Sequence, residues 1–291
     1  MPHVLTLVAA RDATTLSAAD IEAARDAVCG GTPVVLSPAE AVDIPTGDTP
    51  DLAAVRAALG ERPIDAIAVP RRGRRKGLLV ADMDSTIVTG ETLDELADFA
   101  GLKDSIAAIT RAAMNGELNF ADALRERVAM LKGLKLDALD KTWARVRMTP
   151  GARELVRTMA ANNAVTALVS GGFTWFTSRV AAQLGFDIHR ANVLLDDGAA
   201  LTGMVAQPIV DRDTKVTMLR QLAGDRKLRM AATLAVGDGA NDLAMITAAG
   251  LGVAFHAKPV VAQQARVRVD HADLRALLFA QGYRAEEFAV D

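Results

Sequence analysis

The stretch Leu78-Leu79-Val80-Ala81-Asp82-Met83-Asp84-Ser85-Thr86 joins a short apolar run to two acidic residues. Four consecutive apolar residues predict a strand that is buried on both faces, as in a parallel sheet. Side chains two residues apart on an extended backbone point to the same side, so Asp82 and Asp84 should face one pocket at the strand end. Open parallel sheets bind ligands there. The alternative is an Asp-rich turn in which Ser85 or Thr86 caps the next helix.

The pattern of that first run returns several times in the C-terminal two thirds of the chain. Apolar, strand-like runs are expected at 78–81, 165–169, 233–236 and 251–254. Helices are expected near 151–162, 173–184, 214–223 and 241–249. This alternation predicts a doubly wound α/β fold, in which helices cover both faces of a Rossmann-like parallel sheet.

The residues between the first and second strand-like runs interrupt this rhythm. They show helical spacing of apolar residues and no strand pattern, at Thr92–Ala100, Ser105–Met114, Phe120–Leu131 and Leu136–Arg145. We expect them to form a small helical bundle that is inserted after the first strand and overhangs the carboxyl edge of the sheet.

The N-terminal piece differs in composition, because seven of the ten prolines lie within the first 70 residues. Strands are expected at 4–9, 34–36, 41–44 and 66–69, with helices at 18–28 and 52–59. A hairpin between two β/α units predicts a ferredoxin-like α+β domain. The basic segment 71–76 that follows lacks aromatic residues, which favours a solvated linker over a nucleic-acid site.

Composition limits the classes of protein to consider. The 291 residues are 51% hydrophobic and 24% charged, which is typical of a soluble globular protein. A formal net charge of -3 gives no general attraction to nucleic acid or to anionic membranes. The single cysteine, Cys29, excludes an internal disulfide, and the N-terminus has no signal-peptide pattern. We therefore expect a cytoplasmic enzyme that binds neither nucleic acid nor membranes.

A second acidic cluster, Gly237-Asp238-Gly239-Ala240-Asn241-Asp242, follows the apolar run 233–236 in the same way. Its glycines allow a tight backbone turn, and carboxylates are the hard oxygen ligands that Mg²⁺ prefers. A capped turn without a metal is the alternative. Two acidic strand ends in one sheet favour a shared metal site.

Two further segments have the chemistry of an anion site. Ser170-Gly171-Gly172 follows the run 165–169 and offers a hydroxyl and free backbone N–H groups at the start of a helix. Lys215 lies between the second and third of these strand ends along the chain. Considered alone, the serine could be a helix cap and the lysine a surface residue.

The order DxDxT, Ser, Lys and GDGxxD resembles the haloacid dehalogenase superfamily of phosphotransferases. The blocks DMDSTIV, LNFADALRERV, SGGF and VGDGANDLAMI are similar to those of its phosphoserine phosphatases, from about Leu78 to Leu277. The N-terminal segment is weakly similar to amino-acid-binding ACT-like regions. We therefore expect an ACT-like, ferredoxin-like domain at 1–72 and a phosphatase core at 77–291, with the helical cap at about 90–149.

The resemblance implies the last step of serine biosynthesis: hydrolysis of O-phospho-L-serine to L-serine and phosphate through an aspartyl-phosphate. It implies that Asp82 is the nucleophile and Asp84 the general acid and base. Mg²⁺ would be held by Asp82, Asp238 and the main-chain carbonyl of Asp84. Asp242 would not bind the ion itself but would orient metal-bound waters or Lys215.

The resemblance also implies a set of substrate contacts. The phosphoryl group would be bound by Ser170, Gly171 and Lys215. Arg127 would pair with the substrate carboxylate and Glu91 with its ammonium group. The remaining expected contacts are Asn241 and an apolar wall formed by Met114 and Phe120. A homodimer formed through the N-terminal domain is expected as well.

Two other functions are compatible with the same residues. One is a phosphatase or phosphotransferase for another small phosphate monoester, such as phosphohomoserine, because an aspartyl-phosphate can also be passed to an alcohol. The other is an amino-acid-sensing regulator in which the phosphatase core is silent.

Overall fold

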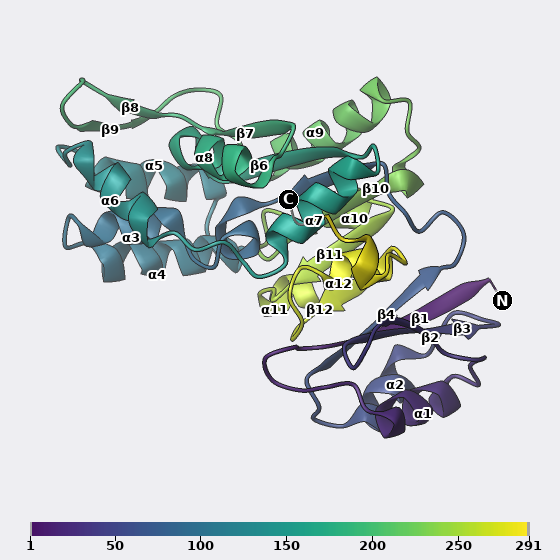
Figure 1. Cartoon of the computed structure of the whole chain (residues 1–291). Coiled ribbons are helices and arrows are strands. Elements are labelled where there is room, and N and C mark those ends of the chain that lie inside the picture. Colours follow the sequence, from purple (N-terminus) through teal and green to yellow (C-terminus); the bar gives the residue numbers. More distant parts are fainter. Residues whose placement is uncertain (1, 290–291) are drawn as a thin grey trace.

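The computed structural model describes residues 2–289, which form a four-stranded antiparallel sheet and a six-stranded parallel sheet, each with its helices (Figure 1). A separate two-stranded hairpin lies beside the inserted helices. None of the helices within these residues has the length and apolar character needed to cross a bilayer.

The N-terminal unit has the β-α-β-β-α-β order expected of a ferredoxin-like domain. Its elements are β1 (His3–Ala9), α1 (Ala18–Ala27), β2 (Val34–Ser37), β3 (Ala41–Thr46), α2 (Leu52–Leu59) and β4 (Ile64–Pro70). The antiparallel sheet has the strand order β2-β3-β1-β4. The helices begin at side-chain caps, a reciprocal Ser17–Asp20 capping box for α1 and Asp51 for α2. The expected fold of this unit is therefore confirmed.

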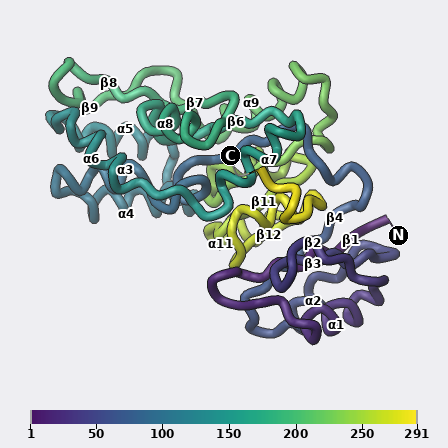
Figure 2. Tube along the Cα trace, in the orientation of Figure 1, coloured from purple at the N-terminus to yellow at the C-terminus, as the bar shows by residue number. Residues whose placement is uncertain are grey.

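Both faces of this antiparallel sheet are covered. Leu5 and Leu7 of β1 belong to the apolar cluster that contains residues of α1 and α2. Val4 and Val8, which alternate with them, belong instead to the main core of the protein. Figures 1 and 2 show this second face turned toward the C-terminal elements of the larger unit.

The larger unit is built on the parallel sheet, with the strand order β12-β11-β10-β5-β6-β7. Its strands are β5 (Leu78–Ala81), β6 (Val165–Phe173), β7 (Ile188–Asn192), β10 (Thr233–Gly237), β11 (Leu251–Phe255) and β12 (Val267–Val269). The helices are α7 (Ala152–Ala161), α8 (Thr174–Leu184), α9 (Arg212–Asp225), α10 (Leu243–Ala248), α11 (Pro259–Ala262) and α12 (Ala276–Ala280). This is the expected doubly wound α/β fold.

The central strand β5 is covered on both faces, which explains why its sequence is apolar at every position. Leu78 and Val80 pack with residues of α9 and α10 on one face of the sheet. Leu79 and Ala81 pack with residues of α7, α8 and α12 on the other. All four side chains are fully buried, as the continuous apolar run predicts.

The sheet is wider than the four strand-like runs predict, because β7 and β12 extend it at its two edges. Strand β7 contains His189 and Arg190, which are exposed, and β12 has only three residues. A hairpin of β8 (Leu194–Asp196) and β9 (Leu201–Val205) was not expected either. These strands are short and half-polar, so pairing with neighbours decides their structure more than local pattern does.

The residues inserted after β5 are helical, as their spacing predicts. They form α3 (Thr92–Asp98), α4 (Lys103–Met114), α5 (Phe120–Met130) and α6 (Asp137–Arg145). We call these helices, with the residues that flank and connect them from 90 to 149, the cap. In Figure 1 the cap lies on the opposite side of the parallel sheet from the N-terminal unit. Substrate-sized ligands at the carboxyl edge of the sheet would therefore meet the cap.

The N-terminal unit is attached to the larger unit through Asp65 of β4. Its buried carboxylate accepts hydrogen bonds from the N–H groups of Asp270, His271 and Ala272, at 2.8, 3.1 and 2.7 Å. We expect Asp65→Ala to lower the free energy of unfolding by about 2–4 kcal/mol, because it leaves three N–H groups without an acceptor, among them the buried N–H group of Ala272. Chemical denaturation measures this change.

Asp48→Ala is a suitable control, because Asp48 belongs to the same unit and is exposed. The free energy of unfolding should stay within about 0.5 kcal/mol of the parent value. Equal stability of the two variants would show that Asp65 does not hold the units together.

Candidate active site

The parallel sheet brings together three polar strand ends. β10, β5 and β6 are neighbours, and Ala81 is in register with both Val236 and Leu168. Each strand is followed by polar residues at the same carboxyl edge. Asp82 therefore lies between the end of β10, which leads to Asp238, and the end of β6, which contains Ser170.

Asp82 and Asp84 do line one pocket, but the backbone reaches it differently from the expectation. The strand ends at Ala81, and residues Met83–Ile87 form one wide turn in which Ser85 has a φ of 54°. The carboxylate of Asp84 is held by the N–H group of Thr92, at 2.9 Å. A turn, rather than a continued strand, thus directs both side chains inward.

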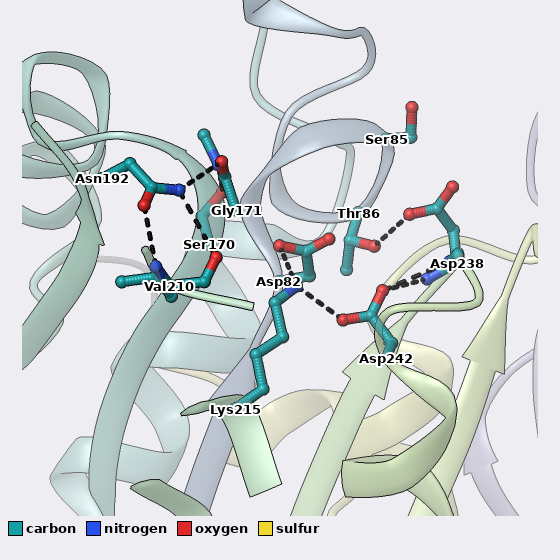
Figure 3. A network of polar contacts seen from close by, with 12 residues as sticks. Asp82, Ser85, Thr86, Ser170, Gly171, Asn192, Val210, Lys215, Asp238 and Asp242 are labelled. Atoms are coloured by element: carbon teal, nitrogen blue, oxygen red, sulfur yellow. Dashed lines mark hydrogen bonds and ion pairs between the residues drawn. The ribbon is translucent and has the colours of Figure 1, made fainter. Parts of the chain in front are cut away.

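Lys215 is the charged centre of the site (Figure 3). Its ammonium group is completely buried, 2.7 Å from Asp82 Oδ1 and 2.6 Å from Asp242 Oδ1. Burial alone would lower the pKa of Lys215, but Asp242 and Asp82 outweigh it and raise the pKa. Lys215 is therefore positively charged and fixes the orientation of Asp82.

In the second acidic cluster, backbone N–H groups bind the side chain of Asp242. The N–H groups of Asp238 and Gly239 both donate to Asp242 Oδ2, at 3.2 Å. A Cβ atom at Gly237 would lie only 2.3 Å from Asp242 Cγ, so this close packing requires glycine. The tight turn holds Asp238 and Asp242 beside the end of β5.

Asp82, Asp238 and Asp242 form a buried cluster that is suited to a metal ion. Each offers a carboxylate oxygen, and the three atoms lie within 4.8 Å of one another. Within residues 2–289, the buried atom Asp238 Oδ2 has no hydrogen-bond donor. Two ammonium groups face the three carboxylates: the buried Lys215, and the partly exposed Lys258, whose Nζ lies 3.8 Å from Asp238 Oδ2. A metal cation would balance the negative charge that remains.

Burial shapes the protonation of this cluster. It raises the pKa of Asp84 well above its usual value, with the Glu91 carboxylate as the next cause. Burial and Asp82 also raise the pKa of Asp242, to about 7, although Lys215 opposes them. Asp84 thus has the raised pKa that suits a general acid.

Ser170, Gly171 and Gly172 belong to the end of β6 and not, as expected, to the start of a helix, because β6 continues to Phe173 and α8 begins only at Thr174. Ser170 is buried, and its Oγ accepts a hydrogen bond from the N–H group of Gly172 at 2.8 Å. The hydroxyl proton of Ser170 is therefore available to a ligand. A Cβ atom at Gly171 would lie 2.4 Å from Phe120 Cζ of the cap, so the cap packs directly on the end of β6.

Nine of the residues expected to act in the site line one pocket with about 350 Å³ of empty space. They are Asp82, Asp84, Glu91, Met114, Phe120, Arg127, Ser170, Gly171 and Asn241. The other three, Lys215, Asp238 and Asp242, lie beside Asp82 as described above. All twelve are thus gathered at one edge of the sheet, and their individual roles stay predictions.

The cap contributes one cation and one anion to the pocket. Glu91 is half-buried and accepts a hydrogen bond from Ser85 Oγ at 2.7 Å. Arg127 is almost completely buried, and its Nε donates to the carbonyl oxygen of Ala123 at 3.1 Å. Such a pair matches the ammonium and carboxylate groups of an α-amino acid.

Asn192, at the end of β7, is a site residue that the sequence did not reveal (Figure 3). Its buried side chain donates to the carbonyl oxygen of Gly171 at 2.8 Å and accepts from the N–H group of Val210 at 2.7 Å. It therefore connects the end of β6, next to Ser170, to the segment before Lys215. No motif marks this residue, because its role depends on an edge strand that was not predicted.

Comparison with known proteins agrees with this arrangement. The family model of haloacid dehalogenase-like hydrolases matches residues 79–247. The chain is 45% identical to the phosphoserine phosphatase of Streptomyces coelicolor over 81% of its length, and spans 57% of that protein. It is 46% identical to the phosphoserine phosphatase of Streptococcus thermophilus over 68% of its length, which covers 93% of that protein.

Solved structures give the same result. A phospho-aspartyl intermediate analogue of phosphoserine phosphatase has a TM-score of 0.67 and 39% identity, covering 70% of this chain and 98% of that one. A probable phosphoserine phosphatase from Vibrio cholerae has a TM-score of 0.78 and 31% identity, covering 97% of this chain and 86% of that one. The chain belongs to the haloacid dehalogenase-like hydrolases and, within them, to the phosphoserine phosphatase family.

Proposed function

We propose that this protein is a Mg²⁺-dependent phosphatase that hydrolyses O-phospho-L-serine to L-serine and phosphate. The observation that carries the proposal is the pocket itself. It combines Asp82 and Asp84 of the core with Glu91 and Arg127 of the cap. Phosphoserine has an ammonium and a carboxylate group at one end, which Glu91 and Arg127 match in charge. Its phosphate at the other end would meet the nucleophile Asp82, the acid Asp84 and the hydroxyl of Ser170.

In the first half of the reaction, a carboxylate oxygen of Asp82 attacks phosphorus and the bond from phosphorus to the seryl oxygen breaks. Asp84 donates its proton to that oxygen, because serine alkoxide is a poor leaving group. Lys215, paired with Asp82 Oδ1, orients the nucleophile and leaves its second oxygen for attack.

In the second half, water attacks phosphorus of the aspartyl-phosphate and Asp84 takes the water proton. The bond from phosphorus to Asp82 breaks, which releases phosphate and restores the carboxylate. The Ser170 hydroxyl and the N–H group of Gly171 would donate to the phosphoryl oxygens, where negative charge is concentrated during both steps.

Asp82 and Asp238, with the main-chain carbonyl of Asp84, would hold Mg²⁺, and Asp242 supports them through Lys215 and the Asp238 N–H group. When bound, the ion supplies positive charge that lets an anionic nucleophile approach an anionic phosphate. The buried Asp238 Oδ2, which lacks a hydrogen-bond donor within residues 2–289, supports this assignment.

The cytoplasmic location of the protein and the homodimer formed through its N-terminal domain stay predictions.

Steady-state kinetics test the proposed reaction directly. We expect Mg²⁺-dependent release of phosphate from L-phosphoserine, with a kcat/KM at least about tenfold above that for phosphohomoserine. Asp82→Asn should abolish turnover, because the amide cannot attack phosphorus. A purified, folded protein without turnover on a panel of phosphate monoesters would instead favour the silent regulator.

Arg127→Ala tests recognition of the carboxylate. We expect kcat/KM for phosphoserine to fall by about 2–3 kcal/mol of transition-state stabilisation, the value of a charge-assisted hydrogen bond. Turnover of an aryl phosphate, which has no carboxylate, should change little. Arg125→Ala is a matched control, because Arg125 is on the same helix and exposed. Equal losses on both substrates would contradict this role for Arg127.

Mg²⁺ should stabilise the protein more at pH 8 than at pH 5. Burial first, and Glu91 next, raise the pKa of Asp84 and of Asp238 in the metal-free protein. The folded state then keeps protons that the unfolded chain loses above about pH 4, so its stability falls as pH rises through the raised pKa values. Mg²⁺ binds the ionised carboxylates and opposes this fall. Thermal unfolding in EDTA and in Mg²⁺ measures this stabilisation. We expect it to be about 2–3 kcal/mol when the Mg²⁺ concentration is 100 times its Kd.

Asp238→Asn should raise the melting temperature of the metal-free protein at pH 8 and remove the response to Mg²⁺. Asp225→Asn, at an exposed position of α9, should retain the full response. A response of equal size in both variants would mean that Mg²⁺ binds elsewhere.

A further inference from the structure

The hydroxyl group of Thr110 joins three helices of the cap. Thr110 belongs to α4 and is 3% exposed. Its Oγ1 atom lies 2.7 Å from Asp94 Oδ1 of α3 and 2.9 Å from Arg127 Nη1 of α5. One buried oxygen thus connects a carboxylate with the guanidinium group that lines the pocket.

The direction of these hydrogen bonds follows from the groups involved. A guanidinium has only donors, so Nη1 of Arg127 donates to Thr110 Oγ1. The single hydroxyl proton of Thr110 then goes to Asp94 at 2.7 Å in preference to its own helix carbonyl, Ile106 O, at 3.0 Å, because a carboxylate is the stronger acceptor. The three groups form a chain in which each bond polarises the next.

This chain fixes one edge of the guanidinium group of Arg127. Nε donates to Ala123 O and Nη1 donates to Thr110, whereas Nη2 has no protein acceptor within residues 2–289. In the same part of the chain, no ion pair of 4.0 Å or less joins Asp94 to Arg127. The interposed hydroxyl therefore anchors the arginine without letting the carboxylate occupy the donors that a ligand would use.

We propose that Thr110 is a positioning residue that holds Arg127 ready for the carboxylate of the substrate. In this role it sets the preference of the enzyme for phosphate monoesters that carry a carboxylate group. The inference rests on the proposed function, and in particular on Arg127 as the carboxylate partner. Thr110 acts through Arg127 and does not itself reach the reacting atoms.

The test compares Thr110→Val, Thr110→Ser and Thr142→Val, with L-phosphoserine and p-nitrophenyl phosphate as substrates. Valine keeps the shape of threonine and removes the hydroxyl group, whereas serine keeps the hydroxyl. Thr142 is a matched control, because it is also a buried cap threonine but donates to Ala138 O of its own helix, at 2.8 Å. All three proteins retain Asp82, Asp84 and the residues of the metal cluster.

We expect Thr110→Val to lower kcat/KM for phosphoserine about tenfold, mainly through KM, and to change that for p-nitrophenyl phosphate less than about twofold. Thr110→Ser should restore kcat/KM for phosphoserine to within about threefold of the parent enzyme. Thr142→Val should not change the ratio of kcat/KM for phosphoserine to kcat/KM for p-nitrophenyl phosphate.

Three results would overturn the proposal. Equal losses on both substrates in Thr110→Val, or the same loss in Thr142→Val, would assign Thr110 a purely structural role. Unchanged kinetics on both substrates would show that Arg127 does not need the hydroxyl. The proposed function fails separately, if the parent enzyme does not hydrolyse phosphoserine or if Arg127→Ala affects the two substrates equally.

Discussion

The buried ion pairs of Lys215 are the interaction on which the rest of the site depends. An isolated ammonium group would lose too much hydration to stay charged in this interior, and so would an isolated carboxylate. Asp82 and Asp242 on either side keep Lys215 charged, and Lys215 in turn supplies a positive charge beside the carboxylate oxygens of both. The excess of carboxylates that remains is a reason for the site to bind a divalent cation.

The parallel sheet explains how residues so far apart in the chain reach this centre. Adjacent parallel strands end at one edge, so the loops after β5, β6 and β10 lie together whatever their separation in sequence. The short helices and tight glycine turns that follow then direct carboxylates and N–H groups into the same space. A sheet of this kind supplies a phosphate site but little selectivity for the rest of a substrate.

Selectivity has to come from the cap, which covers the carboxyl edge of the sheet. Its helices place Glu91 and Arg127 opposite the catalytic carboxylates, and Phe120 packs against Gly171 of the core. Burial makes each charge sensitive to its partners, since few water molecules remain to screen it. The N-terminal unit lies away from the cap helices in Figure 1 and contacts the core through its second sheet face and Asp65.

The sequence by itself determined the doubly wound core, the helical cap and the ferredoxin-like unit, because apolar periodicity is local and strong in long elements. It also determined which residue types meet at the site, since Asp82 and Asp238 directly follow recognisable strands and Ser170 lies near the end of another. Only the tertiary structure decided the turn at Ser85, the edge strand β7 that carries Asn192, and the contact of Thr110 with Arg127. These features depend on pairing and packing between distant segments, and no local pattern encodes such contacts.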